Sequence, residues 1–177
     1  QSVVVWSELS LPRGGVRVIG RVGDFGLPGF VEHVDADSGT TLQSVLDAND
    51  FGPGDAIVLR GEFTEDVVVS AQNAGVLILG EPNATLRGAL TIDHADQVTV
   101  QRLNIVGPLT IAAGTHVAIV DSRVQDVAVS GGSRHVLRNV DAALIELENT
   151  TAVVVEASRA WIRGTTAARN SASARRA

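Results

Sequence analysis

Short alternating apolar triplets follow one another along the chain from about Ala56 onward. Examples are VLI, LTI, VTV, LNI and VAV, with two to six residues between successive triplets. An alternation of apolar and polar positions with a period of two is typical of β-strands that bury one face. We therefore predict a series of short strands separated by short turns.

The triplets recur at a nearly fixed interval, which indicates a repeat architecture. A first row of equivalent positions has separations of 19, 22, 19, 18 and 18 residues and comprises Ile57, Val76, Val98, Val117, His135 and Val153. A second row comprises Leu86, Ile105, Val124, Ala142 and Ala160, and a third comprises Leu90, Leu109, Val127 and Ile145. The extra residues of the longest interval lie in one turn, Leu79 to Asn83 (LGEPN). Insertions confined to turns are expected of a solenoid, whose inward side chains must stay stacked.

These features predict an all-β fold, a parallel β-helix of about six short coils with 18–22 residues each. Each coil contributes three short strands. Aliphatic side chains should stack inside it, at Val98, Val100, Leu103, Ile105, Leu109 and Ile111. The intervening Thr99, Asn104 and Thr110 should point outward, because side chains alternate between the two faces of a strand.

A helix near residues 40–49 should cover the open end of the first coil. Good N-cap residues in Ser38-Gly39-Thr40-Thr41 precede Leu42, Val45 and Leu46 at helical spacing, and Gly52-Pro53-Gly54 ends the segment before strand Ala56–Leu59. Residues 1–37 do not match the coil pattern, and we expect an irregular N-terminal arm with strands at Ser2–Trp6 and Val16–Val22. The β-helix would then span residues 38–163, followed by an extended C-terminal tail over residues 164–177.

The segment GTTLQSVLDANDFGPGDAIVLRGEF resembles the N-terminal cap and first coil of the pectin lyase-like, right-handed parallel β-helix superfamily. The resemblance covers about residues 38–163 and is most specific at the helix and the PGDAIVL that follows it. It implies a right-handed β-helix. It does not imply a reaction, because this superfamily includes polysaccharide lyases and hydrolases, viral spikes and appendages, and surface adhesins. None of the superfamily's catalytic motifs is matched, so no catalytic residue is assigned.

Composition excludes several classes of function. The net charge of −6 and an aromatic content of 3% argue against nucleic-acid binding, which relies on basic surfaces and base stacking. The absence of cysteine excludes thiolate zinc sites and cysteine nucleophiles. No apolar run approaches the roughly 20 residues of a membrane-spanning helix.

The histidines and the acidic loops do not predict a metal site or a cofactor site. The loop Asp93-His94-Ala95-Asp96 has ligand types, but its neighbours one coil later, Ala112 to Thr115, add no carboxylate or imidazole. His116 falls in a turn and should be solvated. His135 falls at an inward position, where we expect a core or edge histidine with its hydrogen bonds satisfied.

Charged residues form outward rows in which carboxylates lie next to arginines or neutral residues. These rows run Asn104, Arg123, Asp141, Arg159 and Gln101, Val120, Arg138, Glu156. Such a pattern is typical of an ion-pair ladder rather than of a carboxylate cluster for catalysis. Glu146 and Glu148 are the exception, since they lie two residues apart on one side of a strand. Candidate binding residues are therefore Arg123, Asp141, Arg159, Glu146 and Glu148.

The last coil predicts contacts with another protein. In the third row, Ile145 is followed by Arg163, no obvious helix covers the sixth coil, and Trp161 and Ile162 lie nearby. An uncovered solenoid end tends to associate. Together with Trp6, Arg169, Arg175 and Arg176, these residues are candidate contacts within a homo-oligomer, such as a trimer, or with a larger lattice such as a capsid.

Taken together, the sequence predicts a non-catalytic structural β-helix protein. It would be a virion component of the capsid-decoration or tail-appendage type, or a surface attachment module, and would therefore lie on a virion or at the cell surface. The alternatives are a carbohydrate-active protein similar to polysaccharide lyases or hydrolases, and a module that binds a glycan without turnover.

Overall fold

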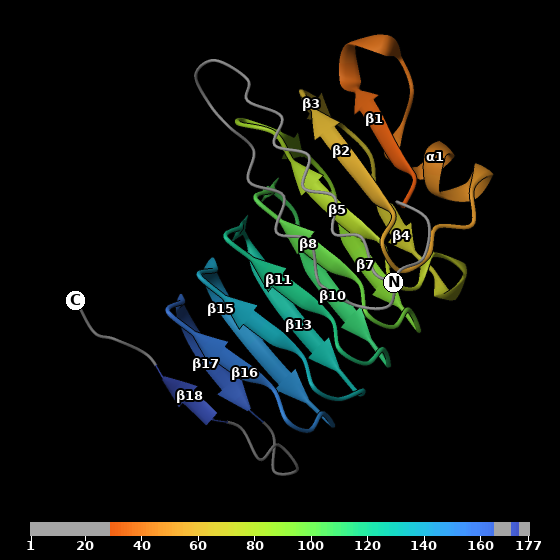
Figure 1. Ribbon diagram of the computed structural model, residues 1–177. Coiled ribbons are helices and arrows are strands. Elements are labelled where there is room, and N and C mark those ends of the chain that lie inside the picture. Colours follow the sequence, from red (N-terminus) through yellow and green to blue (C-terminus); the bar gives the residue numbers. More distant parts are fainter. Residues whose placement is uncertain (1–28, 165–170, 174–177) are drawn as a thin grey trace, which may run out of the picture.

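The computed structural model describes residues 29–164 and the backbone of residues 171–173. It is a parallel β-solenoid of about six turns with one α-helix near the N-terminal end (Figure 1). The predicted architecture is therefore confirmed. The predicted strands at Ser2–Trp6 and Val16–Val22 lie outside the described residues.

The first face of the solenoid is a single parallel sheet. Its strand order is β1-β2-β5-β8-β11-β14-β16-β18. These strands are β1 (Val31–Asp35), β2 (Ala56–Arg60), β5 (Leu77–Gly80), β8 (Thr99–Gln101), β11 (Ala118–Val120), β14 (Val136–Arg138), β16 (Val154–Glu156) and β18 (Ser171–Ser173). β1 pairs in register with β2, so part of the segment assigned to an irregular arm is the first strand of this sheet.

The second and third faces are two ladders that merge in the last turns. The second face contains β3 (Glu62–Phe63), β6 (Thr85–Leu86), β9 (Asn104–Ile105) and β12 (Arg123–Val124). The third contains β4 (Val67–Val69), β7 (Leu90–Asp93), β10 (Leu109–Ala112) and β13 (Asp126–Ser130). β15 (Asp141–Glu148) pairs with both β12 and β13, and β17 (Arg159–Gly164) pairs with β15. One long strand therefore replaces two short ones in each of the last two turns.

The N-terminal end of the core is covered by α1 (Leu42–Ala48), as predicted. Thr41 is the N-cap and its side chain accepts a hydrogen bond from the backbone N–H of Ser44 at 3.1 Å. Leu42, Val45 and Leu46 are buried against the core. Two short 3-10 helices, η1 (Ala36–Ser38) and η2 (Ala71–Asn73), lie on either side in sequence.

Aliphatic rows fill the interior. Every inward position predicted between Val98 and Ile111 is at most 1% exposed. One predicted alignment is wrong: Ile57 pairs with Ile78, not with Val76. Both Val76 and Ile78 point inward, so alternation alone does not distinguish them. The turn that contains η2 sets the register, so the interval from Ile57 to its partner is 21 residues and not the predicted 19.

Two further side-chain predictions are corrected. The residue that follows Ile145 in the third row is Ile162, and Arg163 pairs instead with Glu146. A register shift between Asp141 and Leu144 causes this, because β17 has one residue fewer there than β15. Val120, expected to point outward, is 6% exposed at the end of β11.

The corners of the solenoid are made by single residues in the left-handed region. From the third turn onward, three corner positions recur in successive turns with φ between +48° and +78°. The first is occupied by His94, Ala113, Gly131 and Asn149, the second by Gln97, His116, Arg134 and Ala152, and the third by Arg102, Asp121, Asn139 and Ala157. Most of these are not glycine, so each carries a conformational cost of about 1–2 kcal/mol. The corner N–H groups donate to carbonyls of the next turn, as His116 does to Ser133 at 3.0 Å. Stacking therefore holds the corners in this conformation.

Candidate functional site

A polar groove of about 540 Å³ runs along the corner between the first and second faces. Four successive turns contribute to it, from the ends of β5, β8, β11 and β14 to the strands that follow them. Its lining comprises Gly80, Glu81, Pro82, Asn83, Ala84, Thr85, Arg102, Leu103, Asn104, Asp121, Ser122, Arg123, Asn139 and Asp141. Its lining combines carboxylate, guanidinium, amide and hydroxyl groups, and we therefore take it as the candidate functional site.

One wall of the groove is the loop that joins β5 to β6. The loop begins after Gly80, where a Cβ would lie 2.2 Å from the carbonyl oxygen of Arg102, so only glycine lets the next turn approach this closely. The N–H of Glu81 donates to Leu59 at 2.9 Å, and the N–H of Ala84 donates to Glu81 at 2.9 Å. Pro82 and Asn83 are left exposed at the tip.

The polar side chains of the groove are arranged in pairs across neighbouring turns. Nε of Arg123 lies 3.5 Å from Oδ2 of Asp141, and the amide of Asn139 donates to Oδ1 of Asp121 at 2.9 Å. The lining also contains Arg102, whose Nε is buried without a hydrogen-bond partner. Guanidinium, carboxylate and amide groups in such rows offer paired donors and acceptors to a polyhydroxylated ligand.

The Ser122 hydroxyl in the groove is not free to act as a nucleophile. Ser122 is 5% exposed, and its Oγ donates to the carbonyl of Val120 at 2.8 Å and accepts from the N–H of Leu103 at 3.3 Å. The lining residues include no histidine. The Ser122 hydroxyl is therefore committed to the backbone, and the carboxylates and amides of the lining are the groups that can contact a ligand.

The five predicted binding residues fall into two groups. Arg123 and Asp141 line the groove, and Arg159 is the Cα partner of Asp141 in the next turn. Glu146 and Glu148 lie near the C-terminal end of β15, where Oε1 of Glu146 is 3.8 Å from Nη1 of Arg163. The structure confirms the alternation of charge in the first group but does not bring Glu146 and Glu148 to the same site.

The predicted partner contacts are partly within the described residues. Trp161 is 83% exposed and Ile162 is 38% exposed, and both lie on β17 in the last turn. Trp6, Arg169, Arg175 and Arg176 lie outside the described residues. The last turn thus presents apolar surface, although the interior row continues through Ile162 rather than ending at Arg163.

Acidic and histidine side chains are dispersed. Within the described residues, no three of them are grouped in a way that would hold a metal ion. In the loop after β7, Nδ1 of His94 lies 2.6 Å from Oδ1 of Asp93. Asp96 accepts hydrogen bonds from the hydroxyl and the N–H of Thr115, both at 2.8 Å, and these bonds hold the pKa of its carboxyl below the usual range.

His135 corrects one prediction. The side chain is buried in the core, as expected, but neither ring nitrogen has a hydrogen-bond partner. Burial lowers the pKa of this imidazole, and the backbone of Gly131 opposes the shift only in part. His116, in contrast, is exposed as predicted, with its Nε2 3.4 Å from a guanidinium nitrogen of Arg134.

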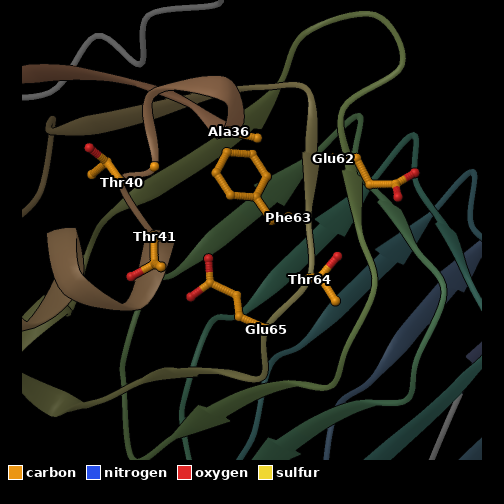
Figure 2. Close-up of a pocket in the computed structure, with 8 residues that line it drawn as sticks. Ala36, Thr40, Thr41, Glu62, Phe63, Thr64 and Glu65 are labelled. Carbon is orange, nitrogen blue, oxygen red and sulfur yellow. The ribbon is translucent and has the colours of Figure 1, made fainter.

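A smaller pocket of about 140 Å³ lies beside the N-terminus of α1 (Figure 2). The Glu65 carboxylate in this pocket accepts hydrogen bonds from the N–H groups of Leu42 and Gln43 at 2.7 and 3.0 Å. These bonds satisfy the first N–H groups of the helix. The pocket is therefore part of the cap that α1 forms over the core.

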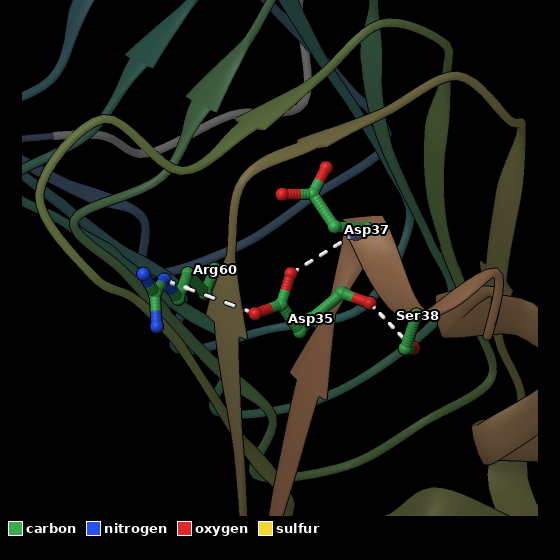
Figure 3. Close-up of polar contacts among 4 residues, drawn as sticks. All are labelled: Asp35, Asp37, Ser38 and Arg60. Carbon is green, nitrogen blue, oxygen red and sulfur yellow. Dashed lines mark hydrogen bonds and ion pairs between the residues drawn. The ribbon is translucent and has the colours of Figure 1, made fainter.

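Asp35 ends β1 in a similar structural role (Figure 3). Its Oδ1 accepts from the N–H of Asp37 at 3.0 Å, its carbonyl accepts from the hydroxyl of Ser38 at 2.6 Å, and its Oδ2 lies 3.8 Å from Nε of Arg60. These contacts begin the 3-10 helix η1 and link it to β2. These contacts explain why polar residues are found at the end of β1, and no ligand is needed to explain them.

The groove itself was not predicted, although its signal is present in the sequence. The long interval of the repeat places extra residues in the loop Leu79 to Asn83. A loop that is longer than the equivalent corners in the next turns forms a wall over them. The row of Asn104, Arg123 and Asp141 was identified, but not the wall beside it.

Comparisons with protein-family models, with curated proteins and with solved structures found no match to this chain. The function proposed below is therefore inferred from the geometry of the described residues. Within those residues, no helix has the length and apolar character needed to cross a membrane.

Proposed function

We propose that this protein is a non-catalytic structural module that acts through protein–protein contacts at its last turn. Self-association is the contact we propose, in a homo-oligomer such as a trimer. The settings that suit such a module are a virion, as a capsid-decoration or tail-appendage component, or a cell surface. Membership of the pectin lyase-like superfamily is part of the same proposal.

The observation that supports this proposal is the difference between the two ends of the core. At the first turn, α1 buries Leu42, Val45 and Leu46 over the end of the solenoid. At the sixth turn, no helix among the described residues covers β17, and the indole of Trp161 is 83% exposed. An exposed indole beside Ile162 is the kind of aromatic anchor found at the centre of protein interfaces.

The groove supports a binding role over a catalytic one. Arg123 and Asp141 neutralise each other, Asp121 accepts from Asn139, and both sides of the Ser122 hydroxyl are occupied. An enzyme that removes an α-proton from a uronate would need an uncommitted base beside a positive charge. Asp121, Arg123, Asn139 and Asp141 are instead paired across successive turns, as in a structural ladder.

Measurement of molar mass by light scattering across a range of protein concentrations tests the proposal. We expect an oligomer for the wild type, a shift towards monomer for Trp161→Ser, and no shift for the control Val68→Ser. Val68 is also an exposed apolar residue, at 44%, but lies on β4 in the first turn. A wild-type protein that stays monomeric at all concentrations would refute the proposal.

Glycan binding in the groove is a second candidate function, which the polar lining favours. We propose that hydroxyl groups of a saccharide bind beside Asn104, Arg123 and Asp141. A glycan array would show saturable binding that Arg123→Ala and Asn104→Ala weaken and that the control Glu146→Ala leaves unchanged. Incubation with uronate polymers distinguishes a lyase, because unsaturated products absorb ultraviolet light. Absence of binding across the array would count against this candidate.

A further inference from the structure

His135 is the one buried titratable side chain among the described residues. The other buried polar side chains there are Asn73, Ser122 and Thr150, which do not titrate. His135 lies in an interior row whose other members are all valine, at Val76, Val98, Val117 and Val153. The fifth turn thus has an imidazole where its neighbours in the fourth and sixth turns have an isopropyl group.

The ring is packed against the backbone of Gly131 and Gly132. Neither Nδ1 nor Nε2 makes a hydrogen bond. A Cβ added to Gly132 would lie 2.8 Å from Nε2, so the ring approaches the bare backbone of that glycine. A protonated imidazole has two N–H donors and a positive charge, and in this position the backbone of Gly131 favours the charged form but offsets the cost of its burial only in part.

The charged groups around this corner do not compensate for a positive charge. On the side of the fourth turn lies His116, which is exposed, and Arg134 next to His135 is in contact with it. Asp96, two turns away, is held by the hydroxyl and N–H of Thr115. On the side of the sixth turn, Thr150 to Val153 contain no titratable group. The remaining neighbours in the row are valines.

We propose that His135 makes the last turns of the solenoid sensitive to acid, so that the opening equilibrium constant of the fourth to sixth turns rises as the pH falls below about 6.5 while that of the earlier turns does not. The direction follows from linkage. A histidine that is neutral in the closed turns and free to protonate in the opened ones contributes stability above its ordinary pKa of 6.5, and that stability is lost progressively as the pH falls from 6.5 towards the lowered pKa of the closed turns.

The loss of stability is confined to the turns around His135 because each turn of a solenoid contacts only its neighbours. His135 lies one turn from the end of the core, where the interior row loses its cover, because Ile162 is 38% exposed whereas Ile145, its partner one turn earlier, is fully buried. Opening from this end disrupts few contacts. The first three turns have α1 at their other end and no titratable group in their core.

Hydrogen exchange of the full chain at pH 7.5 and pH 5.0 tests the proposal, with protection corrected for the intrinsic exchange rate. At pH 5.0 an accessible histidine is about 1.5 pH units below its ordinary pKa, so the opening equilibrium constant should rise by up to about 30-fold. We expect this loss of protection at Leu137 and Val155 but not at Ile57 and Ile78.

Two variants distinguish His135 from other groups that titrate. His135→Val, which matches Val117 and Val153 on either side, should keep its protection at pH 5.0. His116→Gln should lose protection as the wild type does. A wild type that loses no protection, a loss of equal size in all turns, or a loss that persists in His135→Val would overturn the proposal. An NMR titration of the imidazole provides a second readout, and a His135 ring that protonates at its ordinary pKa in the folded chain would also overturn it.

Discussion

Arg123 on β12 and Asp141 on β15 are Cα partners in successive turns, and Nε of the arginine lies 3.5 Å from Oδ2 of the aspartate. This ion pair is at the edge of the polar groove, and the two side chains are 74% and 46% exposed. Exposed pairs of this kind are screened by solvent, so the pair organises the groove more than it stabilises the fold.

A double-mutant cycle of Arg123→Ala and Asp141→Ala should give a coupling energy of at most about 1 kcal/mol, since both side chains are largely exposed. Urea unfolding of the four proteins at low and high salt measures it. The coupling should decrease further at high salt. A coupling of several kcal/mol that salt does not change would contradict this interpretation.

Gly132→Ala should destabilise the protein by about 3 kcal/mol or more, because the new Cβ would lie 1.9 Å from the carbonyl oxygen of Gly114 and would force two turns apart. Gly131→Ala is the matched control, since its Cβ would meet nothing closer than 3.6 Å and only the φ of +78° is unfavourable. We expect a loss of about 1–2 kcal/mol for the control. Equal losses in thermal unfolding would show that the close approach is not important.

Ala113→Gly should raise the free energy of unfolding by up to about 1 kcal/mol. Ala113 has φ of +55°, and the relief from this conformation exceeds the entropy that glycine adds to the unfolded chain. Ala118→Gly, in strand β11, should have the opposite effect and lower it by about 0.5–1 kcal/mol. Denaturant unfolding measures both, and a change of the same sign in both would be inconsistent with strained corners.

The carboxyl of Asp96 should titrate below the usual aspartate range because it accepts two hydrogen bonds from Thr115 in the next turn. A lowered pKa of an acid stabilises the fold above the ordinary pKa, and this contribution is lost as the pH falls through the lowered value. Thr115→Val removes the hydroxyl but keeps the N–H, so the pKa of Asp96 should rise part of the way back. Carbon NMR titration of the side chain measures the change, and an unchanged pKa in Thr115→Val would refute the role of the hydroxyl.

The repeat could be predicted from the sequence because inward rows leave a period-two pattern at a fixed interval. Leu109, Val127 and Ile145 align as predicted, as do Asn104, Arg123, Asp141 and Arg159. The predicted alignment of inward residues is wrong where the number of residues per turn changes. Val76 and Ile78 both fit an inward phase, and one residue fewer in β17 moved Ile162 to the position expected for Arg163.

The candidate site was only half predictable. The polar row of the groove follows from the strand register, but the volume beside it depends on how the loop after Gly80 turns, which no periodicity encodes. The same is true of His135. Its inward phase was evident, whereas the lack of a hydrogen-bond partner depends on the path of the backbone at Gly131 and Gly132.

The loop from Glu81 to Ala84 has a consequence for engineering. Only its tip, Pro82 and Asn83, is exposed, because Ala84 is buried in the core and its carbonyl accepts from the N–H of Asn104 at 3.2 Å. The strands on both sides of the loop keep their partners in the next turn. A peptide of different length inserted between Pro82 and Asn83 would change the shape of the groove wall while the interior rows stay in register. This corner is therefore the place at which new recognition sequences can be grafted without redesign of the core.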